Sequence, residues 1–139
     1  MMIWVLLLFS TFALAQDDKG TSLTVNISGI EESKGQLVVS LWPSESAWDE
    51  KKALHRLAIP LQNGGGTWSC ENLLPGNYAV TVFYDKNSNM KMDRHWYGPP
   101  KEKGAASNGA KAQTFGPPKW QDMEFEITSE PKTIEIKFE

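Results

Sequence analysis

The sequence has a single cysteine, Cys70, so no disulfide can form within the chain in any compartment. Cys70 follows Trp68 by two residues on the apolar face of an expected strand. This position favours a small buried hydrophobic side chain over a reactive thiol. The chain also lacks a combination of cysteines and histidines spaced for zinc, because only His95 lies near the polar loop considered below.

Positive charge is not in excess either, since 14 Lys and Arg stand against 17 Asp and Glu. Without a basic stripe for a phosphate backbone, we expect no nucleic-acid binding. A nucleophile elbow, a Cys–His arrangement and a zinc-hydrolase signature are all missing from the sequence. We therefore expect no catalytic residues. The alternative is a hydrolase that uses Asp85 and Asp93, with His95 as a further titratable group.

An uncharged apolar run begins at Met1 and ends in Ala13-Leu14-Ala15, followed by polar residues. The run is too short for a convincing membrane span, and its end is typical of a cleaved secretory signal. We expect residues 1–15 to be removed and 16–139 to form one secreted or periplasmic domain without a transmembrane span. The Lys or Arg that usually precedes such a run is missing, so an uncleaved anchor is the alternative.

Apolar and polar residues alternate through most of the remaining chain. Alternation buries one face of a strand and leaves the other in water. About seven strands, separated by Gly, Pro and Asn, predict an all-β, antiparallel two-sheet sandwich of the transthyretin-like or Ig-like kind. The alternating stretches are 23–28, 35–42, 57–61, 68–70, 78–84, 123–127 and 134–138.

Three local features refine this prediction. Ser44 is a good N-cap for a short helix reaching Lys52. Pro60 cannot donate to a strand ladder, so we expect its strand to lie at a sheet edge or to end there. Pro75-Gly76 suits a type II turn, and Tyr78 is placed to hydrogen-bond back across that corner.

The connection from Asp85 to Trp120 shows almost no helix or strand pattern. Connections of this length are usually functional or disordered, and disordered segments are poor in the aromatic residues present here. A pattern of aromatic, Gly, Pro, Pro and Lys occurs twice, from Tyr97 and from Phe115. Paired prolines restrict the backbone to an extended form. We predict an ordered cover over one end of the sandwich.

The segment Tyr-Asp-Lys-Asn-Ser-Asn-Met-Lys-Met-Asp opens this connection and spaces its oxygen-bearing side chains regularly. Asp85, Asn87 and Asn89 occupy the first, third and fifth places of an EF-hand-type loop, where alternate side chains turn towards a Ca²⁺ ion. The Lys91 backbone carbonyl and Asp93 occupy the seventh and ninth places. Calcium needs six to eight oxygen ligands, so this spacing predicts a candidate metal loop.

Two positions depart from the EF-hand pattern. Met90 stands where the sharp turn needs Gly, and Trp96 stands where a bidentate Glu belongs, which leaves Glu102 as the candidate for the missing acid. So few carboxylates predict a weak site, with a dissociation constant of about 0.1–1 mM. The same spacing is typical of a polar turn in which Asp and Asn bond their own backbone, so spacing alone leaves both interpretations open.

Several short segments follow one another in a specific order along the chain. Taken together, they resemble the small secreted bacterial proteins catalogued as domain of unknown function twenty-one forty-one. The resemblance runs from about Leu23 to Phe138 and implies an acid at Glu102 and a Ser-Asn pair at Ser107-Asn108, which join Trp96 as loop-site candidates. It brings no known activity, and the chain departs from it at Met90 and at Ala105-Ala106. The segments are 35–41, 74–80, 85–89 with Asp93, Gly98-x-Pro100-x-Glu102, Ser107-Asn108 and 115–118.

From these features we expect a non-catalytic binding module at the cell envelope, with a glycan or protein partner and a weak Ca²⁺-stabilised loop. The alternative is a carbohydrate- or peptide-binding module without metal. Coplanar exposed indoles near the loop would favour that alternative, whereas a deep pocket at the loop carboxylates would favour the hydrolase. The tryptophans in question are Trp42, Trp48, Trp96 and Trp120.

Overall fold

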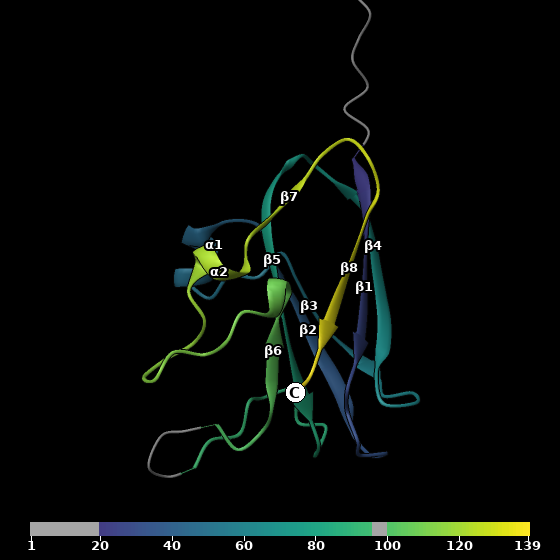
Figure 1. Ribbon diagram of the computed structural model, residues 1–139, viewed down its shortest axis with the longest axis vertical. Helices are drawn as coiled ribbons and strands as arrows, with labels where there is room; N and C mark the ends of the chain where they lie inside the picture. The colour runs from purple at the N-terminus through teal and green to yellow at the C-terminus, as the bar shows by residue number, and fades with distance from the viewer. Residues whose placement is uncertain (1–19, 96–99) are drawn as a thin grey trace, which may run out of the picture.

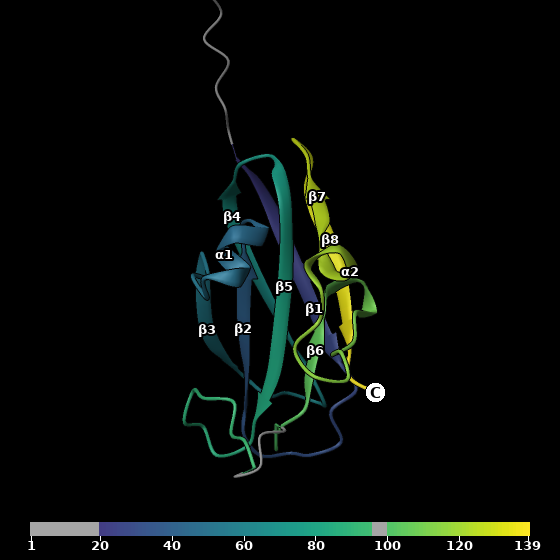
Figure 2. The same ribbon diagram turned by 90° about the vertical axis from the view of Figure 1, so that its left-hand side faces the viewer.

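The computed structural model describes residues 20–95 and 100–139, and two β-sheets packed face to face make up its body (Figures 1 and 2). The smaller sheet has the order β4 (Gly66–Leu73), β1 (Thr21–Ser28) and β8 (Lys132–Lys137). The larger has the order β3 (His55–Pro60), β2 (Gln36–Trp42), β5 (Gly76–Asp85) and β6 (Gly104–Ala106), and β7 (Phe125–Ile127) pairs with the start of β5. Short helical turns are α1 (Glu45–Asp49), η1 (Ser107–Gly109) and α2 (Trp120–Met123).

The predicted all-β sandwich is confirmed, with two differences in detail. An eighth strand, β6, lies inside the connection that shows no strand pattern. The pair β1 and β8 is parallel, with Leu23 opposite Lys132, although the other strand pairs are antiparallel. Almost the whole domain connects these two strands, so no hairpin turn restricts their relative direction.

Most of the local predictions hold, but α1 ends at Asp49 instead of reaching Lys52, and Gly76 has φ +158°, which is not the value of about +80° that a type II turn needs. The Ser44 hydroxyl accepts a hydrogen bond from the Ala47 backbone N–H at 3.0 Å and caps α1. The Tyr78 hydroxyl donates to the Leu74 carbonyl at 2.7 Å across the corner. Strand β3 lies at a sheet edge and ends at Pro60. Cys70 packs against the core, and its burial raises the pKa of the thiol, which disfavours the reactive thiolate.

Both faces of the larger sheet are covered. Its inner face packs on the smaller sheet through residues such as Val39 and Val82. On its outer face, Val38 is fully buried and Phe83 is 7% exposed. A second core forms there from Trp42, Ala79, Ala106, Trp120 and Met123. The predicted cover therefore lies over the outer face of this sheet, and not only over one end.

The predicted signal, residues 1–15, lies outside the described part of the chain. Within that part, no helix is both long enough and apolar enough to cross a membrane.

Candidate functional site

The candidate loop begins where β5 ends and returns to the same sheet as β6. Asp85 is the last residue of β5 and pairs in register with Gln36 of β2. The Tyr84 N–H donates to the Lys103 carbonyl at 2.9 Å, so both ends of the loop are held at one edge. Gly35 has φ +105°, and a Cβ there would lie 2.7 Å from the Asp85 carbonyl oxygen. Only glycine fits this close approach.

Asp85 is fully buried, and its carboxylate organises the first turn of the loop. One oxygen accepts from the Met90 N–H at 2.8 Å and from Gln36 Nε2 at 2.9 Å, and the other accepts from the Asn89 N–H at 3.2 Å. Met90, which replaces the usual Gly, adopts φ +65°. The tight turn therefore forms despite the Met90 side chain, because the buried Asp85 carboxylate holds the backbone N–H groups of Asn89 and Met90.

A second group of polar side chains gathers around Asp93. Its carboxylate accepts hydrogen bonds from Asn87 Nδ2 at 2.7 Å and from Asn89 Nδ2 at 3.0 Å. The hydrogen bonds from Asn89 and then from Asn87 lower the pKa of Asp93. Asn89 Oδ1 in turn accepts from the Lys91 N–H at 2.9 Å. The predicted loop residues thus meet in space, although the amide nitrogens, and not the amide oxygens, face the carboxylate.

Glu102 completes this group from the far end of the loop. The Lys101 N–H donates to the Asp93 carbonyl at 2.7 Å, which brings the next side chain against Asp93. Burial raises the pKa of Glu102, and contact with the Asp93 carboxyl raises it further. Glu102 Oε2 is buried and has no hydrogen-bond partner among the described residues. Two carboxyl groups in contact need either a shared proton or a cation.

The loop therefore unites four of the six predicted ligands and uses Asp85 differently. In residues 20–95 and 100–139, no three His, Cys, Asp or Glu side chains gather closely enough to hold a metal by themselves. An ion beside Asp93 would need amide oxygens from Asn87 and Asn89, which a half-turn of each amide group supplies. The negative charge of Asp85 also contributes to the raised pKa of Glu102.

Of the three other loop-site candidates, Ser107 and Asn108 have structural roles, whereas Trp96 is not among the residues that the structure describes. The Ser107 hydroxyl accepts from the Val80 N–H at 3.1 Å and donates to the Met123 carbonyl at 2.6 Å. Asn108 Nδ2 donates to the Glu124 carbonyl at 2.7 Å. These residues join η1 to β5 and to the end of α2, at a distance from Asp93 along the sheet. Trp96 lies outside the described residues.

Trp42 and Trp120 are each 6% exposed and belong to the second core, so they cap the core and give no support to the alternative of exposed tryptophans. Trp48 is half-buried and meets Trp42 edge-on at 81°, with the Lys51 ammonium 4.1 Å from its ring centroid. A groove of about 300 Å³ lies between α1 and residues 113–121, and none of its lining residues belongs to the loop site.

The sequence pattern missed Gln36 and Arg56, which hold the loop from the neighbouring strands. Arg56 Nη2 donates to the Met90 carbonyl at 2.7 Å, and its guanidinium lies 5.5 Å from the Phe83 ring centroid. Both residues occupy outward positions that normally face water. Their role is visible only through the strand register, which aligns Gln36 with Asp85.

Comparison with known proteins gives one match. The model of a family described as "Uncharacterized protein conserved in bacteria (DUF2141)" matches residues 25–135. No curated protein and no solved structure matches the chain.

Proposed function

The chain belongs to the DUF2141 family of uncharacterised bacterial proteins, and we propose that it is a non-catalytic envelope module whose loop binds Ca²⁺. The observation that supports the metal is the contact between the Asp93 and Glu102 carboxyl groups, with Glu102 Oε2 left without a partner among the described residues. Ionised carboxylates in contact repel each other. A calcium ion between them would replace that repulsion with attraction and satisfy the unpaired oxygen.

The proposed ligands are the side-chain oxygens of Asp93, Glu102, Asn87 and Asn89, with water and a backbone carbonyl such as that of Lys91. Such a set suits a hard cation that accepts six to eight oxygens. Two carboxylates give low affinity, which suits the millimolar Ca²⁺ outside cells. The sequence signal expected at residues 1–15 supports an extracytoplasmic location. In this proposal the ion joins the two ends of the loop across the sheet edge.

Thermal unfolding with Ca²⁺ and with chelator tests the metal. At about ten times the dissociation constant, binding adds about 1.4 kcal/mol, so the melting temperature should rise by about 5 °C in a domain of this size. Asp93→Asn should abolish the rise. Asp85 is a poor choice for this purpose, because its carboxylate holds the loop in the metal-free protein. Identical melting curves for the wild type at millimolar Ca²⁺ and in chelator would overturn the proposal.

Glu102→Gln should separate the metal from simple loop packing. The raised pKa of Glu102 means that its protonated form stabilises the fold below its unfolded-state pKa, and this contribution is lost as pH rises through the folded-state pKa. An uncharged amide avoids that loss. In chelator at pH 7 the E102Q variant should therefore melt no lower than the wild type, yet gain nothing from Ca²⁺. A variant that melts lower and still responds to Ca²⁺ contradicts the assignment.

A further inference from the structure

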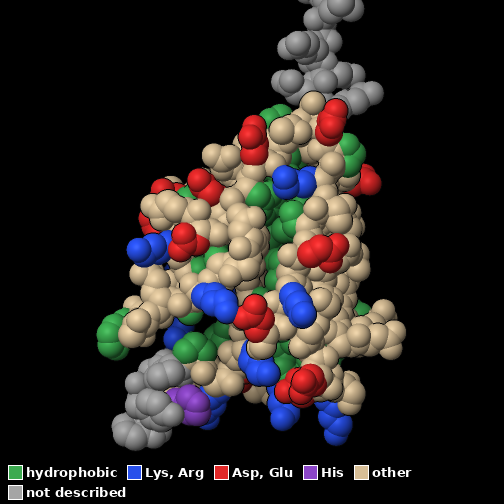
Figure 3. Space-filling model, viewed as in Figure 1, with side chains coloured by type: hydrophobic (Ala, Val, Ile, Leu, Met, Phe, Trp, Pro, Cys, Tyr) green, Lys and Arg blue, Asp and Glu red, His purple; other side chains and the backbone are tan. Residues whose placement is uncertain are grey.

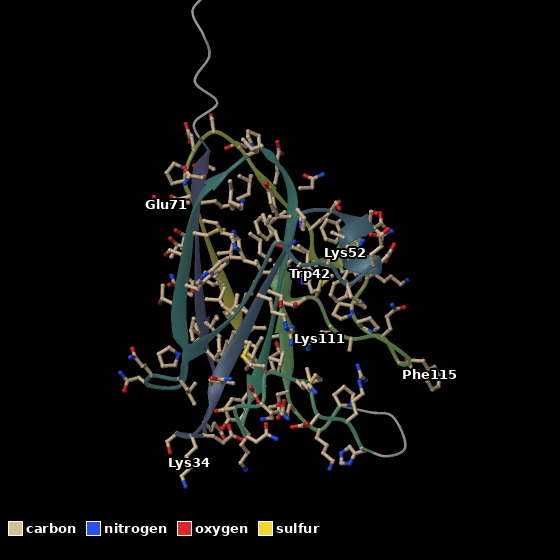
Figure 4. All side chains as sticks on the ribbon, turned by 180° about the vertical axis from the view of Figure 1, so that it is seen from behind. Lys34, Trp42, Lys52, Glu71, Lys111 and Phe115 are labelled. Atoms are coloured by element: carbon tan, nitrogen blue, oxygen red, sulfur yellow. The ribbon has the colours of Figure 1, made fainter. Side chains whose placement is uncertain are left out.

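The connection between β3 and β4 is a tight turn that presents Asn63 to solvent. Asn63 and Gly64 have φ angles of +50° and +81°, and the backbones of Gln62 and Gly65 close the turn with hydrogen bonds of 2.8 and 3.0 Å. Asn-Gly is the preferred pair for a hairpin turn with two positive φ angles. The turn projects from the right of the molecule as an uncharged lobe in Figure 3, and Figure 4 shows it at the opposite end of β4 from Glu71.

The packing of the turn requires glycine at position 64. A Cβ there would lie 2.6 Å from the Ile30 carbonyl oxygen, and the Ile30 N–H donates to the Gly64 carbonyl at 2.9 Å. Asn63 in turn tolerates the left-handed conformation better than most residues that carry a side chain. The fold therefore selects an Asn-Gly pair. Such a pair is chemically labile, because glycine has no side chain to shield its nitrogen from the preceding Asn side chain.

The groups that would react at Asn63 are not held by hydrogen bonds within residues 20–95 and 100–139. The Asn63 side chain is exposed, and neither its amide, nor its backbone carbonyl, nor the Gly64 N–H has a hydrogen-bond partner in that part of the chain. The peptide unit between the two residues can therefore rotate without breaking a hydrogen bond. This rotation brings the Gly64 nitrogen towards the Asn63 side-chain carbonyl.

Asn108-Gly109 is a second Asn-Gly pair in the chain, and it differs in these restraints. Asn108 is also exposed and also has a positive φ, of +59°. However, its Nδ2 donates to the Glu124 carbonyl at 2.7 Å and to the Met123 carbonyl at 3.2 Å. These bonds hold the amide group that would have to turn and leave. The two pairs thus match in exposure and in sequence, and hydrogen bonding separates them.

We propose that Asn63 is a site of spontaneous deamidation. The Gly64 nitrogen gives its proton to hydroxide and attacks Asn63 Cγ, and a succinimide ring closes. The Cγ–Nδ2 bond breaks, and the departing amide takes a proton from water and leaves as ammonia. Water then opens the ring at either carbonyl, which gives aspartate or isoaspartate without oxidation or reduction. Isoaspartate adds one atom to the main chain of the turn, so the bond to Ile30 should be lost.

Peptide mapping of the native protein by mass spectrometry tests the proposal. During incubation in mildly alkaline buffer, the amide at Asn63 should be lost at least about tenfold faster than the amide at Asn108, because freeing Asn108 costs two hydrogen bonds. Both aspartate and isoaspartate should appear at position 63. Equal rates at the two asparagines overturn the proposal. Aspartate alone at position 63 also overturns it, because direct hydrolysis would then replace the succinimide.

The same measurement in concentrated urea is the control, since both pairs lose their folded surroundings there. The two asparagines should then react at similar rates, and a preference for Asn63 that persists in urea overturns the structural argument. Asn63→Asp carries the new charge without the extra main-chain atom. Hydrogen exchange at the Ile30 amide should be faster in the isoaspartyl protein than in N63D. Equal protection of that amide would contradict the expected loss of its bond to Gly64.

Discussion

Asp85→Ala should lower the free energy of unfolding by about 4 kcal/mol, the largest effect expected for a single substitution in the loop. The change leaves three donors without their acceptor: the Met90 N–H, the Asn89 N–H and Gln36 Nε2. Because the carboxylate is fully buried, water cannot replace it without rearrangement. Asp85→Asn keeps the shape of the side chain but directs its amide NH₂, a donor, towards the other donors. It should lower the free energy of unfolding by about half as much.

Urea unfolding in chelator, followed by tryptophan fluorescence, measures this effect without any contribution from the metal. Asp49→Ala is the matched control, because Asp49 is exposed on α1 and its loss should change stability by less than about 0.5 kcal/mol. If the two variants unfold at the same urea concentration, Asp85 does not organise the loop. A cost confined to Ca²⁺-containing buffer would instead assign Asp85 to the metal.

Asp85 also illustrates what sequence reasoning could find at this site. The spacing of polar residues in the sequence correctly predicted that these side chains converge in one loop, since Asn87, Asn89 and Asp93 do meet within hydrogen-bond distance. It could not assign the role of each carboxylate. That role depends on the Asn89 and Met90 N–H groups of the same loop and on Gln36, which strand register brings to Asp85 from β2. Spacing along one segment carries no information about a neighbouring strand.

The sandwich was predictable because alternation reports burial on one face of a strand, and Leu23, Val25 and Ile27 of β1 are nearly fully buried as expected. The same rule fails on the outer face of the larger sheet. Ser40 is polar and alternates with apolar neighbours, yet it is 2% exposed and accepts a hydrogen bond from Arg56 through its hydroxyl. Residues that are distant in the sequence can bury the outward side chains of a strand, and the alternation of apolar and polar residues along the strand does not report this.

Strand β6 was missed for a related reason. Its three residues, Gly104–Ala106, are too few and too small to show alternation. They form a strand because β5 turns the backbone groups of Val82 to this side, between the Val80 N–H, which the Ser107 hydroxyl accepts, and the Tyr84 N–H, which donates to the Lys103 carbonyl. The ladder then breaks between β6 and β7, and this break is where the Ser-Asn pair acts.

Ser107→Ala should lower the free energy of unfolding by about 3 kcal/mol, although the change removes only one oxygen atom. On the edge of β5 that faces β6 and β7, neither of these strands pairs with Val80, and the Ser107 hydroxyl accepts a hydrogen bond from the Val80 N–H at 3.1 Å instead. The same hydroxyl donates to the Met123 carbonyl at 2.6 Å. Ser107 is 1% exposed and Val80 is fully buried, so the orphaned N–H could not turn to water.

Ser69→Ala gives the matched control, since that hydroxyl lies on the exposed face of β4 and its hydrogen bond, at 3.2 Å, joins it to the exposed Thr24 hydroxyl. Its loss should cost less than about 0.5 kcal/mol. Denaturant unfolding should separate the two variants clearly, and hydrogen exchange should show faster exchange at the Val80 amide in S107A alone. Equal stability of the two variants would mean that the buried N–H finds another acceptor. The Ser-Asn pair would then not be what closes the break in the larger sheet.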